Sequence, residues 1–597
     1  MTVDAVSTGK TGLAMQGYHP SRLELTKYFF FTGKGGVGKT SAACATAVNL
    51  ADSGKQVMLI STDPASNLQD VFGVELDNKG TNIPEVPNLT VVNLDPVQAA
   101  QEYKEKVIGP YKGILPDAVI ANMEEQLSGS CTVEIAAFNE FSHFLTDTTI
   151  KDRYEHIIFD TAPTGHTLRM LQLPSAWSNF ISENTHGASC LGQLSGLESN
   201  KDMYKHAVTT LANPELTTVM LVSKPEKTPL LEAKRAAEEL KELGVANQSL
   251  ILNGVLELDS TTDETALQLC HKQQQALQQI PEYLLTLPAY YIPLRAYNVY
   301  GISHIRAMLT EKYLGEQPVT NPLAPVHSLK QLVDELYTGQ KKVIFTMGKG
   351  GVGKSTLAAA IALGLVEKGA KVHLTTTDPA HHLQFLLTDS PLLQVSHIDE
   401  QAELAKYKEE VLAKAREALG NADLAYIEED LRSPCTQEIA VFRAFAEIVE
   451  QADNQVVVID TAPTGHTLLL LDATQSYHKE IEKSQGDIPA SVKKLLPRLR
   501  NAAETEVVIV TLPEATPVHE AARLSEDLKR AGISAAWWIV NSSFYLTATQ
   551  SPLLKAKAQS EVEWINQVAA LSQGHTVVIP WYDNELQQQE LLELVRQ

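Results

Sequence analysis

The chain carries one glycine-rich loop twice, GKGGVGKT at residues 33–40 and GKGGVGKS at residues 348–355. Each copy follows a short apolar run and precedes an Ala- and Leu-rich stretch of helical character, the context in which GxxxxGK[ST] binds phosphate. Backbone N–H groups and a helix N-terminus attract phosphate oxygens there. A glycine-rich turn without nucleotide is the alternative. The repetition favours two nucleotide sites, formed by Gly33, Gly35, Gly36, Gly38, Lys39, Thr40, Gly348, Gly350, Gly351, Gly353, Lys354 and Ser355.

The last two residues of each loop have separate expected roles. Lys39 and Lys354 are expected to reach the β- and γ-phosphates. Thr40 and Ser355 are expected to coordinate Mg²⁺, which prefers oxygen ligands.

Two pairs of aspartates accompany the loops. Asp160 and Asp460 end apolar runs, where a P-loop protein places the carboxylate that supports Mg²⁺. Asp63 and Asp378 stand in TDP, and an Asp before Pro is also common in simple turns. Both lie at the same offset from their loops, 315 residues apart, and this repetition favours a role in orienting the attacking water.

The whole chain reads as a duplication. STDPASNL pairs with TTDPAHHL, CTVEIAAFNEF pairs with CTQEIAVFRAF, and DTAPTGHT occurs twice, always in the same order. We predict a first half at residues 1–320, a linker at 321–340 that begins rich in Pro, and a second half at 341–597.

The elements expected in each half alternate between apolar strands and helices. This alternation is typical of a doubly wound α/β domain with a mainly parallel sheet covered on both faces. The predicted fold is therefore two tandem P-loop NTPase domains that form a pseudo-twofold dimer within one chain. Their ligands should lie beyond the carboxyl ends of the strands.

Composition excludes several classes of protein. The net charge of −23 over 597 residues argues against nucleic-acid binding. The N-terminus does not resemble a signal peptide, and no apolar run is long enough to span a membrane directly. Five cysteines without a CxxC pair do not form a disulfide framework, so a reduced, cytoplasmic location is expected.

Three of the cysteines have a pattern of their own. Cys131 and Cys435 are related by the repeat and begin matching helical segments, whereas the second half has Ala490 where the first has Cys190. Three thiolates suit a pyramidal soft ion such as As(III) or Sb(III), whereas zinc normally takes four ligands. Burial in a core is the alternative for any single cysteine, and we assign Cys44 and Cys270 to it.

The second residue of each loop, Lys34 or Lys349, is not required by an ordinary P-loop. KGGVGK[ST] resembles the deviant P-loop of a family that includes the cell-division ATPase MinD, the nitrogenase iron protein and arsenical pump ATPases. The resemblance implies ATP hydrolysis and a lysine that contacts phosphate across a dimer interface. Each half of this chain would then offer its lysine to the ATP of the other half.

Within that family, the fused halves, the two DTAPTGHT stretches and the cysteines are most similar to the arsenical pump ATPases. The resemblance implies a metalloid site and ATP hydrolysis that energises a membrane arsenite efflux carrier, through which the chain would associate peripherally with the membrane. A metallochaperone is a second candidate partner. A purely structural role for His166, His466 and Ser433 stays open. The implied metalloid ligands are Cys131, Cys190, Cys435, His166, His466 and Ser433.

Two further interpretations concern recognition of the adenine base and the coupling of metalloid binding to the ATP sites. Asn253 and Asn541 end late strands, where an amide can pair with an adenine edge, as a similar residue does in this family; capping of a strand end is the alternative. DTAPTGHT places its Asp at the nucleotide and its His toward the metalloid. We therefore expect metalloid binding to draw the halves together and complete the ATP sites.

The main competing hypothesis is an ATPase that targets tail-anchored membrane proteins. Such proteins share these motifs but are usually dimers of single halves joined by zinc at a CxxC, which this chain lacks. No Met cluster occurs at residues 101–130 or 401–432, the mixed-charge segments expected to face a carrier or chaperone. A non-catalytic scaffold is a weaker alternative, because both sets of nucleotide motifs are intact.

Overall fold

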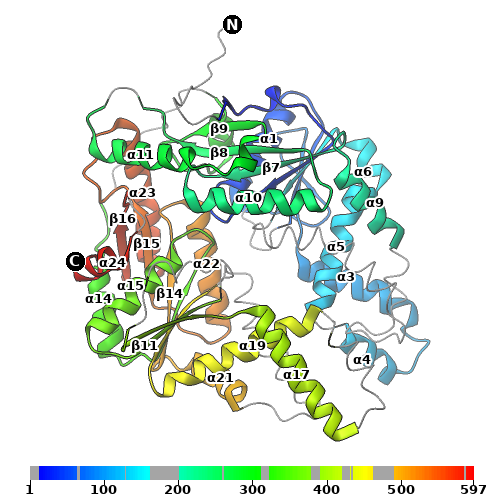
Figure 1. Ribbon diagram of the computed structural model, residues 1–597. Helices are drawn as coiled ribbons and strands as arrows, with labels where there is room; N and C mark the ends of the chain where they lie inside the picture. The colour runs from blue at the N-terminus through cyan, green and yellow to red at the C-terminus, as the bar shows by residue number, and fades with distance from the viewer. Residues whose placement is uncertain are drawn as a thin grey trace.

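The computed structural model describes most of the chain (Figure 1). None of the helices in this described part is both long and apolar enough to cross a lipid bilayer. The described residues are 13–62, 68–127, 130–161, 201–258, 261–310, 322–377, 387, 390–419, 431, 434–461, 490–583 and 586–597.

The first half, which we define as residues 13–310, is built on one sheet of nine strands in the order β1-β9-β8-β7-β2-β6-β3-β5-β4. Neighbouring strands are parallel except β4 and β5. The strands are β1 (Met15–Gly17), β2 (Tyr28–Thr32), β3 (Val57–Ser61), β4 (Thr81–Asn82), β5 (Leu89–Asn93), β6 (His156–Asp160), β7 (Thr217–Ser223), β8 (Gln248–Val255) and β9 (Ala289–Pro293).

The second half, residues 322–597, has a sheet of seven strands in the order β12-β11-β13-β10-β14-β15-β16, all parallel. These strands are β10 (Val343–Met347), β11 (Val372–Thr376), β12 (Leu393–His397), β13 (Val456–Asp460), β14 (Thr505–Thr511), β15 (Trp537–Ser543) and β16 (Thr576–Pro580).

The two sheets share one topology, because the order of the second is the order of the first without the edge strands β1 and β4. In each sheet the strand before the glycine-rich loop, β2 or β10, pairs with the strand that ends in the buried aspartate, β6 or β13. Parallel strands bring their carboxyl ends to one edge, so the loop and the aspartate meet there. The predicted tandem α/β fold is confirmed.

Helices cover both faces of each sheet (Figure 1). Those of the first half are α1 (Lys39–Asp52), α2 (Leu68–Phe72), α3 (Pro96–Ile108), α4 (Asp117–Gln126), α5 (Ser130–Thr146), α6 (Thr148–Arg153), α9 (Lys201–Ala212), α10 (Lys227–Glu242), α11 (Glu264–Gln278), α12 (Glu282–Leu285) and α13 (Ile302–Met308). Those of the second half are α14 (Leu329–Thr338), α15 (Lys354–Glu367), α17 (Glu400–Leu419), α19 (Pro434–Glu450), α21 (Ala490–Arg500), α22 (Ala515–Arg530), α23 (Pro552–Leu571) and α24 (Gln588–Arg596).

The strands are apolar because both faces of each sheet are buried. Tyr28–Thr32 is entirely buried, and its alternate residues contribute to different cores: Phe30 packs with Phe159 on one face, whereas Phe29 and Phe31 pack on the other. The second sheet has the same two-sided arrangement, with Phe345 in one cluster and Ile344 in the other. Such continuous burial explains the absence of alternating polar residues in these strands.

The segment expected to be a linker contains a helix that packs on the second half. α14 begins with a capping box between Ser328 and Gln331, and it buries Leu332 and Val333 in a core beside α15 and α24. A capping box satisfies two backbone N–H groups that the helix start leaves unpaired. The exact domain boundaries stay a prediction.

The halves contact each other through an apolar cluster and polar bonds. Leu256 and Leu269 of the first half pack with Phe544 and Leu554 of the second. Asp263 accepts hydrogen bonds from Thr549 Oγ1 at 2.9 Å and from the Gln550 backbone N–H at 2.6 Å. The two nucleotide-type loops therefore belong to one packed body.

Candidate functional site

Each glycine-rich loop leads straight into a helix, as a phosphate-binding loop must. α1 begins at Lys39 and α15 at Lys354, and the preceding Gly38 and Gly353 both have φ of 93°. A side chain is strained at such a positive φ, and here it would also clash with Asn253 or Asn541. The two loops have the same backbone form, so the sequence repeat is a structural repeat.

A hydroxyl and a carboxylate meet at the start of each helix. Thr40 Oγ1 donates to Asp160 Oδ2 at 2.8 Å, and Ser355 Oγ donates to Asp460 Oδ2 at 2.6 Å. Both carboxylates are 1% exposed. This set of hard oxygen donors beside a phosphate-type loop fits Mg²⁺.

The loop lysines fold back over their loops. Lys39 Nζ donates to the carbonyl oxygen of Lys34 at 3.2 Å, and Lys354 Nζ donates to that of Lys349 at 3.0 Å. Both lysines are 6% exposed, so each ammonium is held over the curve of its loop. A phosphate that enters the loop would meet this charge at short range.

The two loops touch each other across the boundary between the halves. A Cβ placed on Gly35 would lie 2.8 Å from Gly350 Cα, and one on Gly351 would lie 2.5 Å from the carbonyl oxygen of Gly35. Real Cβ atoms do not approach so closely, so only glycine allows this contact. The sequence predicted a dimer within one chain, but glycines as the contact between loops were missed. Their duplication in a fused chain was the available signal.

The two late-strand asparagines hold the loops. Asn253 Nδ2 donates to the carbonyl oxygen of Val37, and Asn541 Nδ2 to that of Val352, each at 2.9 Å. β8 changes register directly after Asn253, and β15 changes register between Val540 and Ser543, around Asn541. Each amide therefore connects a late strand to the loop, and its pairing with adenine stays a prediction.

The second-position lysines have unequal surroundings. Lys349 Nζ forms an ion pair with Glu520 of α22, in its own half, and the two side chains are 16% and 5% exposed. No carboxylate in the described residues lies within ion-pair distance of Lys34. Both lysines stand next to the contact between the loops, and their proposed reach across it stays a prediction.

Cys131 and Cys435 occupy equivalent places in the backbone. Each is the second residue of its helix, α5 or α19, and these two helices of different halves contact each other. Figure 1 shows the beginning of α5 beside α19. The fold thus brings the two repeat-related helices to one place, which is what a shared thiol site requires.

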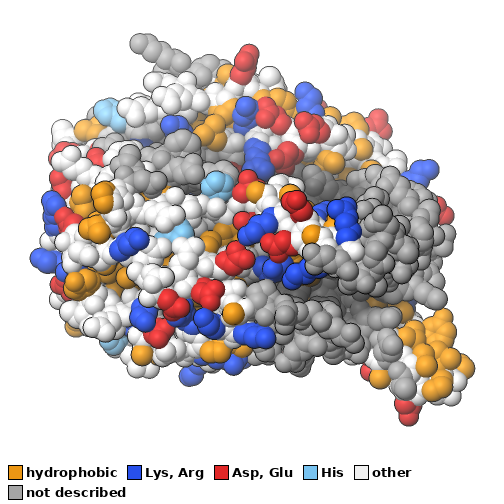
Figure 2. All heavy atoms as spheres, turned by 60° about the horizontal axis from the view of Figure 1, so that its bottom comes forward, with side chains coloured by type: hydrophobic (Ala, Val, Ile, Leu, Met, Phe, Trp, Pro, Cys, Tyr) orange, Lys and Arg blue, Asp and Glu red, His pale blue; other side chains and the backbone are white. Residues whose placement is uncertain are grey.

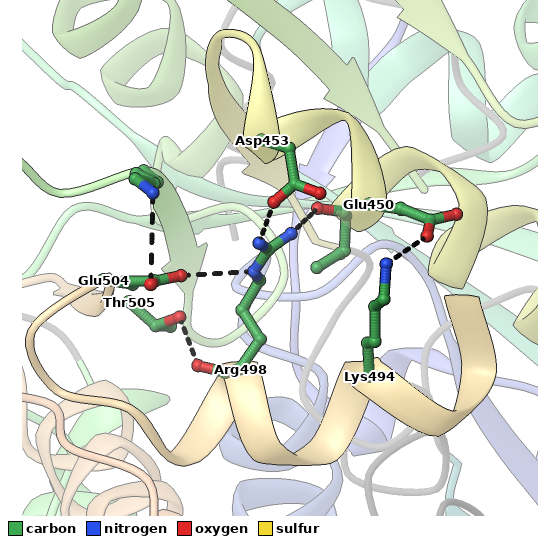
Figure 3. A network of polar contacts seen from close by, with 8 residues as sticks. Glu450, Asp453, Lys494, Arg498, Glu504 and Thr505 are labelled. Carbon is green, nitrogen blue, oxygen red and sulfur yellow. Dashed lines mark hydrogen bonds and ion pairs between the residues drawn. The ribbon is translucent and has the colours of Figure 1, made fainter. Parts of the chain in front are cut away.

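The far end of α19 is fixed by charges from α21 (Figure 3). Arg498 pairs with Asp453, donates from Nη1 to the carbonyl oxygen of Val449 at 3.0 Å, and donates from Nε to Glu504 at 3.3 Å. Thr505, the first residue of β14, donates from Oγ1 to the Arg498 carbonyl oxygen at 2.8 Å. Sequence reasoning missed this network, which connects α19 to the sheet.

The other two cysteines lie elsewhere. Cys44 is buried in α1, and burial, aided by the negative charge of Asp160, raises the pKa of its thiol well above the usual range. Cys270 packs against the apolar cluster between the halves, and burial also raises its thiol pKa. Both thiols stay protonated at neutral pH, consistent with the structural role expected for them.

Several predicted site residues lie outside the described part of the chain. They are Asp63, Asp378, Cys190, His166, His466 and Ser433, and their roles stay predictions.

Comparisons with known proteins agree with this geometry. A profile of the family described as "Anion-transporting ATPase" matches residues 26–313, 341–499 and 483–597. The chain is similar to an "Arsenical pump-driving ATPase" of Acidiphilium multivorum, with 48% identity over 93% of this chain and 96% of the relative. It is 46% identical to a protein of the same description from Escherichia coli, over the same shares of the two chains.

A more distant relative matches half of the chain. "ATPase GET3" of Kluyveromyces lactis is 30% identical over 47% of this chain and 87% of its own length. The match covers most of the relative but about half of this chain, as expected if the relative has the length of one half.

Proposed function

Because this chain belongs to the family of anion-transporting ATPases, it is an ATP-hydrolysing enzyme, and we propose that arsenite or antimonite stimulates it to energise a membrane efflux carrier. The observation that carries this proposal is the contact of the two phosphate-type loops across the halves. A ligand that tightens the boundary between the halves would act on both ATP sites at once.

Each ATP site has its own set of groups in our proposal. Backbone N–H groups of the loop and Lys39 or Lys354 bind the phosphates. Thr40 with Asp160, and Ser355 with Asp460, hold Mg²⁺, which would neutralise charge on the phosphates during transfer. Asp63 and Asp378 orient the attacking water, and the amides of Asn253 and Asn541 contact adenine.

The second-position lysines complete each site from the opposite half. Lys349 would stabilise charge on the ATP of the first half, and Lys34 that on the ATP of the second half, in the manner of an arginine finger. The loops already touch, so a small movement of the halves would change this contact strongly.

The metalloid site is proposed at the beginning of α5 and α19. Cys131 and Cys435 would be joined by Cys190, with His166, His466 and Ser433 as further ligands. As(III) or Sb(III) bound to residues of both halves would hold the two helices together. The DTAPTGHT stretches would transmit this change to the nucleotides.

An exposed apolar surface gives the proposed carrier or metallochaperone a place to bind. Tyr111 and Ile114, between α3 and α4, are 45% and 76% exposed, and Val119 of α4 is 43% exposed. Figure 2 shows hydrophobic side chains gathered on the lobe that α4 forms. Contiguous exposed apolar side chains mark interaction surfaces. Through such a partner, the enzyme would act in the cytoplasm at the membrane surface.

The same surface is the observation that favours the second candidate, targeting of tail-anchored membrane proteins. Sequence reasoning looked for a Met cluster and so missed this patch of Tyr, Ile and Val. A pull-down with a tail-anchored client decides between the partners: retention of the client, without any response to arsenite, would favour targeting.

Direct metal analysis tests the proposed metalloid site. After incubation with arsenite and desalting, the reduced protein should retain about one arsenic per chain. The Cys131→Ser/Cys435→Ser variant should lose most of it, whereas the matched Cys44→Ser/Cys270→Ser variant should retain it. Equal retention by both variants would contradict the site.

A further inference from the structure

Helix α22 makes three neighbouring contacts, two with residues of the first half and one with Lys349 of its own half. His519 stacks on Tyr300 of the first half, with ring centroids 5.9 Å apart. Glu520 pairs with Lys349, and Arg523 Nη2 pairs with Asp70 Oδ2 at 2.6 Å.

Asp70 belongs to α2, which follows directly on residues 63–67, the segment that contains the proposed water-orienting Asp63. One helix of the second half therefore contacts both the second loop's lysine and a segment beside the first ATP site.

The first half does not repeat this arrangement. The repeat aligns Glu520 with Glu232 and Arg523 with Arg235 of α10, each 288 residues earlier. Arg235 pairs with Glu239 of its own helix at 2.7 Å, and no ion pair of Glu232 occurs among the described residues. The duplicated sequences thus have unequal charge pairing at equivalent places.

The pair of Lys349 and Glu520 is well sheltered from water. Glu520 is 5% exposed. Glu514, at the start of the same helix, also interacts electrostatically with Lys349. Burial raises the pKa of Glu514, but the charges of Lys557, Lys224 and Lys349 outweigh it and hold that pKa below its usual range. Lys349 therefore faces two carboxylates of its own half.

We infer that Glu520 is a positioning residue that holds Lys349 in its own half and so withholds it from the ATP of the first half. This inference rests on the proposed reach of each second-position lysine across the halves. Lys34 has no such restraint among the described carboxylates. The two ATP sites are consequently unequal: the first is gated by release of Lys349, and the second is not gated by this pair.

Single-site enzymes test this assignment. Lys354→Ala leaves the first site to hydrolyse ATP, and Lys39→Ala leaves the second. In the Lys354→Ala background without metalloid, Glu520→Gln should raise kcat about three- to tenfold, with KM for ATP nearly unchanged. Glu232→Gln is the matched control and should leave kcat unchanged, whereas Glu520→Asp should return kcat toward its starting value.

A second measurement does not depend on turnover. An amine-reactive acylating reagent should label Lys34 faster than Lys349 in the otherwise unaltered chain, as read by mass spectrometry. Glu520→Gln should raise the labelling rate of Lys349 and leave that of Lys34 unchanged. Unchanged labelling of Lys349 would overturn the inference even if the variant were poorly active.

The outcomes distinguish a failure of the reach of Lys349 across the halves from a failure of its restraint by Glu520. If Lys349→Ala fails to lower kcat in the Lys354→Ala/Glu520→Gln background, where the lysine is released, the reach of the lysine across the halves is wrong, and the proposed function must be revised. If Lys349→Ala lowers kcat but Glu520→Gln matches Glu232→Gln, only the restraint by Glu520 is wrong. An equal rise with Glu520→Gln in both single-site backgrounds also overturns it.

Discussion

At the scale of single residues, the two halves keep the same phosphate and metal groups while their surroundings diverge. Thr40 with Asp160 and Ser355 with Asp460 form the same hydroxyl–carboxylate bond, whereas Lys349 pairs with Glu520 and no described carboxylate lies within ion-pair distance of Lys34. This inequality is the basis of our proposal that the two sites share a mechanism and differ in regulation.

The hydroxyls at the start of α1 and α15 provide the first prediction. Thr40→Ala or Ser355→Ala removes an oxygen ligand, so turnover at that site should fall about tenfold or more, with a higher Mg²⁺ requirement. Steady-state hydrolysis in single-site backgrounds measures this. Ser41→Ala and Thr356→Ala, one residue further on, are the matched controls. An unaltered Mg²⁺ dependence in Thr40→Ala would rule out the metal role.

A buried glutamate of α23 provides the second prediction. Glu561 accepts from Ser543 Oγ at 2.8 Å and from the Tyr545 backbone N–H at 3.1 Å. Burial raises its pKa to about 7, although Lys557 opposes that rise. The first half has Gln273 at the related position, which accepts from the Leu256 backbone N–H at 2.9 Å. A neutral amide side chain can therefore make the corresponding hydrogen bond at the position of Glu561.

The raised pKa fixes the sign of the pH effect. Between the unfolded value, about 4.5, and about 7, the folded state holds the proton more tightly, so stability falls as pH rises. Glu561→Gln should therefore gain stability over the unaltered chain across this window, by up to about 3 kcal/mol above pH 7. Melting temperatures from pH 5 to pH 8 measure the trend. Glu563→Gln, at an exposed position, should show no pH-dependent gain in stability. The same trend in both variants would contradict the assignment of the pH effect to Glu561.

At the scale of elements, much of the fold followed from sequence pattern. Apolar runs such as KYFFFTG predicted buried parallel strands, because both faces of these sheets are covered. The sequence predicted only a linker at residues 321–340, where the structure has helix α14. Helix α14 is buried against α15 and α24. Because α24 lies far from α14 along the chain, the local sequence pattern did not show where α14 packs.

The candidate site was predictable to a similar extent. The position of Asp160 and Asp460 beside the loops was predictable because the spacing of these motifs is local and repeated. Glu520 and Arg498 were not found, since a single Glu or Arg on a helix shows no partner until the helices pack. Glu520 and Lys349 are 171 residues apart, and Arg498 and Asp453 are 45 apart, so these contacts depend on tertiary structure.

The link between α21 and α19 provides the third prediction. Arg498 is 13% exposed on its side chain and contacts three acceptors, of which only the carbonyl oxygen belongs to a buried residue, Val449, so loss of that bond in Arg498→Ala should cost about 2 kcal/mol locally. Hydrogen exchange in α21 and at the end of α19 should become faster by a corresponding factor. Lys494→Ala breaks a more exposed pair with Glu450, at 3.0 Å, and is the control. Equal exchange in the two variants would count against the link.

At the scale of the whole molecule, the boundary between the halves positions the chemistry. The loops touch at glycines, and an apolar cluster and several polar bonds surround that contact. Fusion into one chain also allows the two faces of the boundary to diverge, which identical subunits cannot do. The unequal pairing of Lys34 and Lys349 is one result.

The apolar cluster between the halves provides the fourth prediction. Phe544 is 7% exposed, stacks on Trp581 and packs with residues of the first half. Phe544→Ala should weaken the boundary by about 3 kcal/mol and speed hydrogen exchange in both α11 and α23. Tyr545→Ala, at the exposed neighbouring residue, should have little effect. Faster exchange in α23 alone would show that the cluster does not join the halves.

The central claim is that metalloid binding between the halves stimulates ATP hydrolysis. The measurement that tests it most directly is steady-state hydrolysis by the purified, reduced protein with and without arsenite or antimonite. We predict a clear rise that disappears in the Cys131→Ser/Cys435→Ser variant and persists in Cys44→Ser/Cys270→Ser. Intact basal turnover without any response to either metalloid would contradict the claim and leave an ATPase that responds to another ligand.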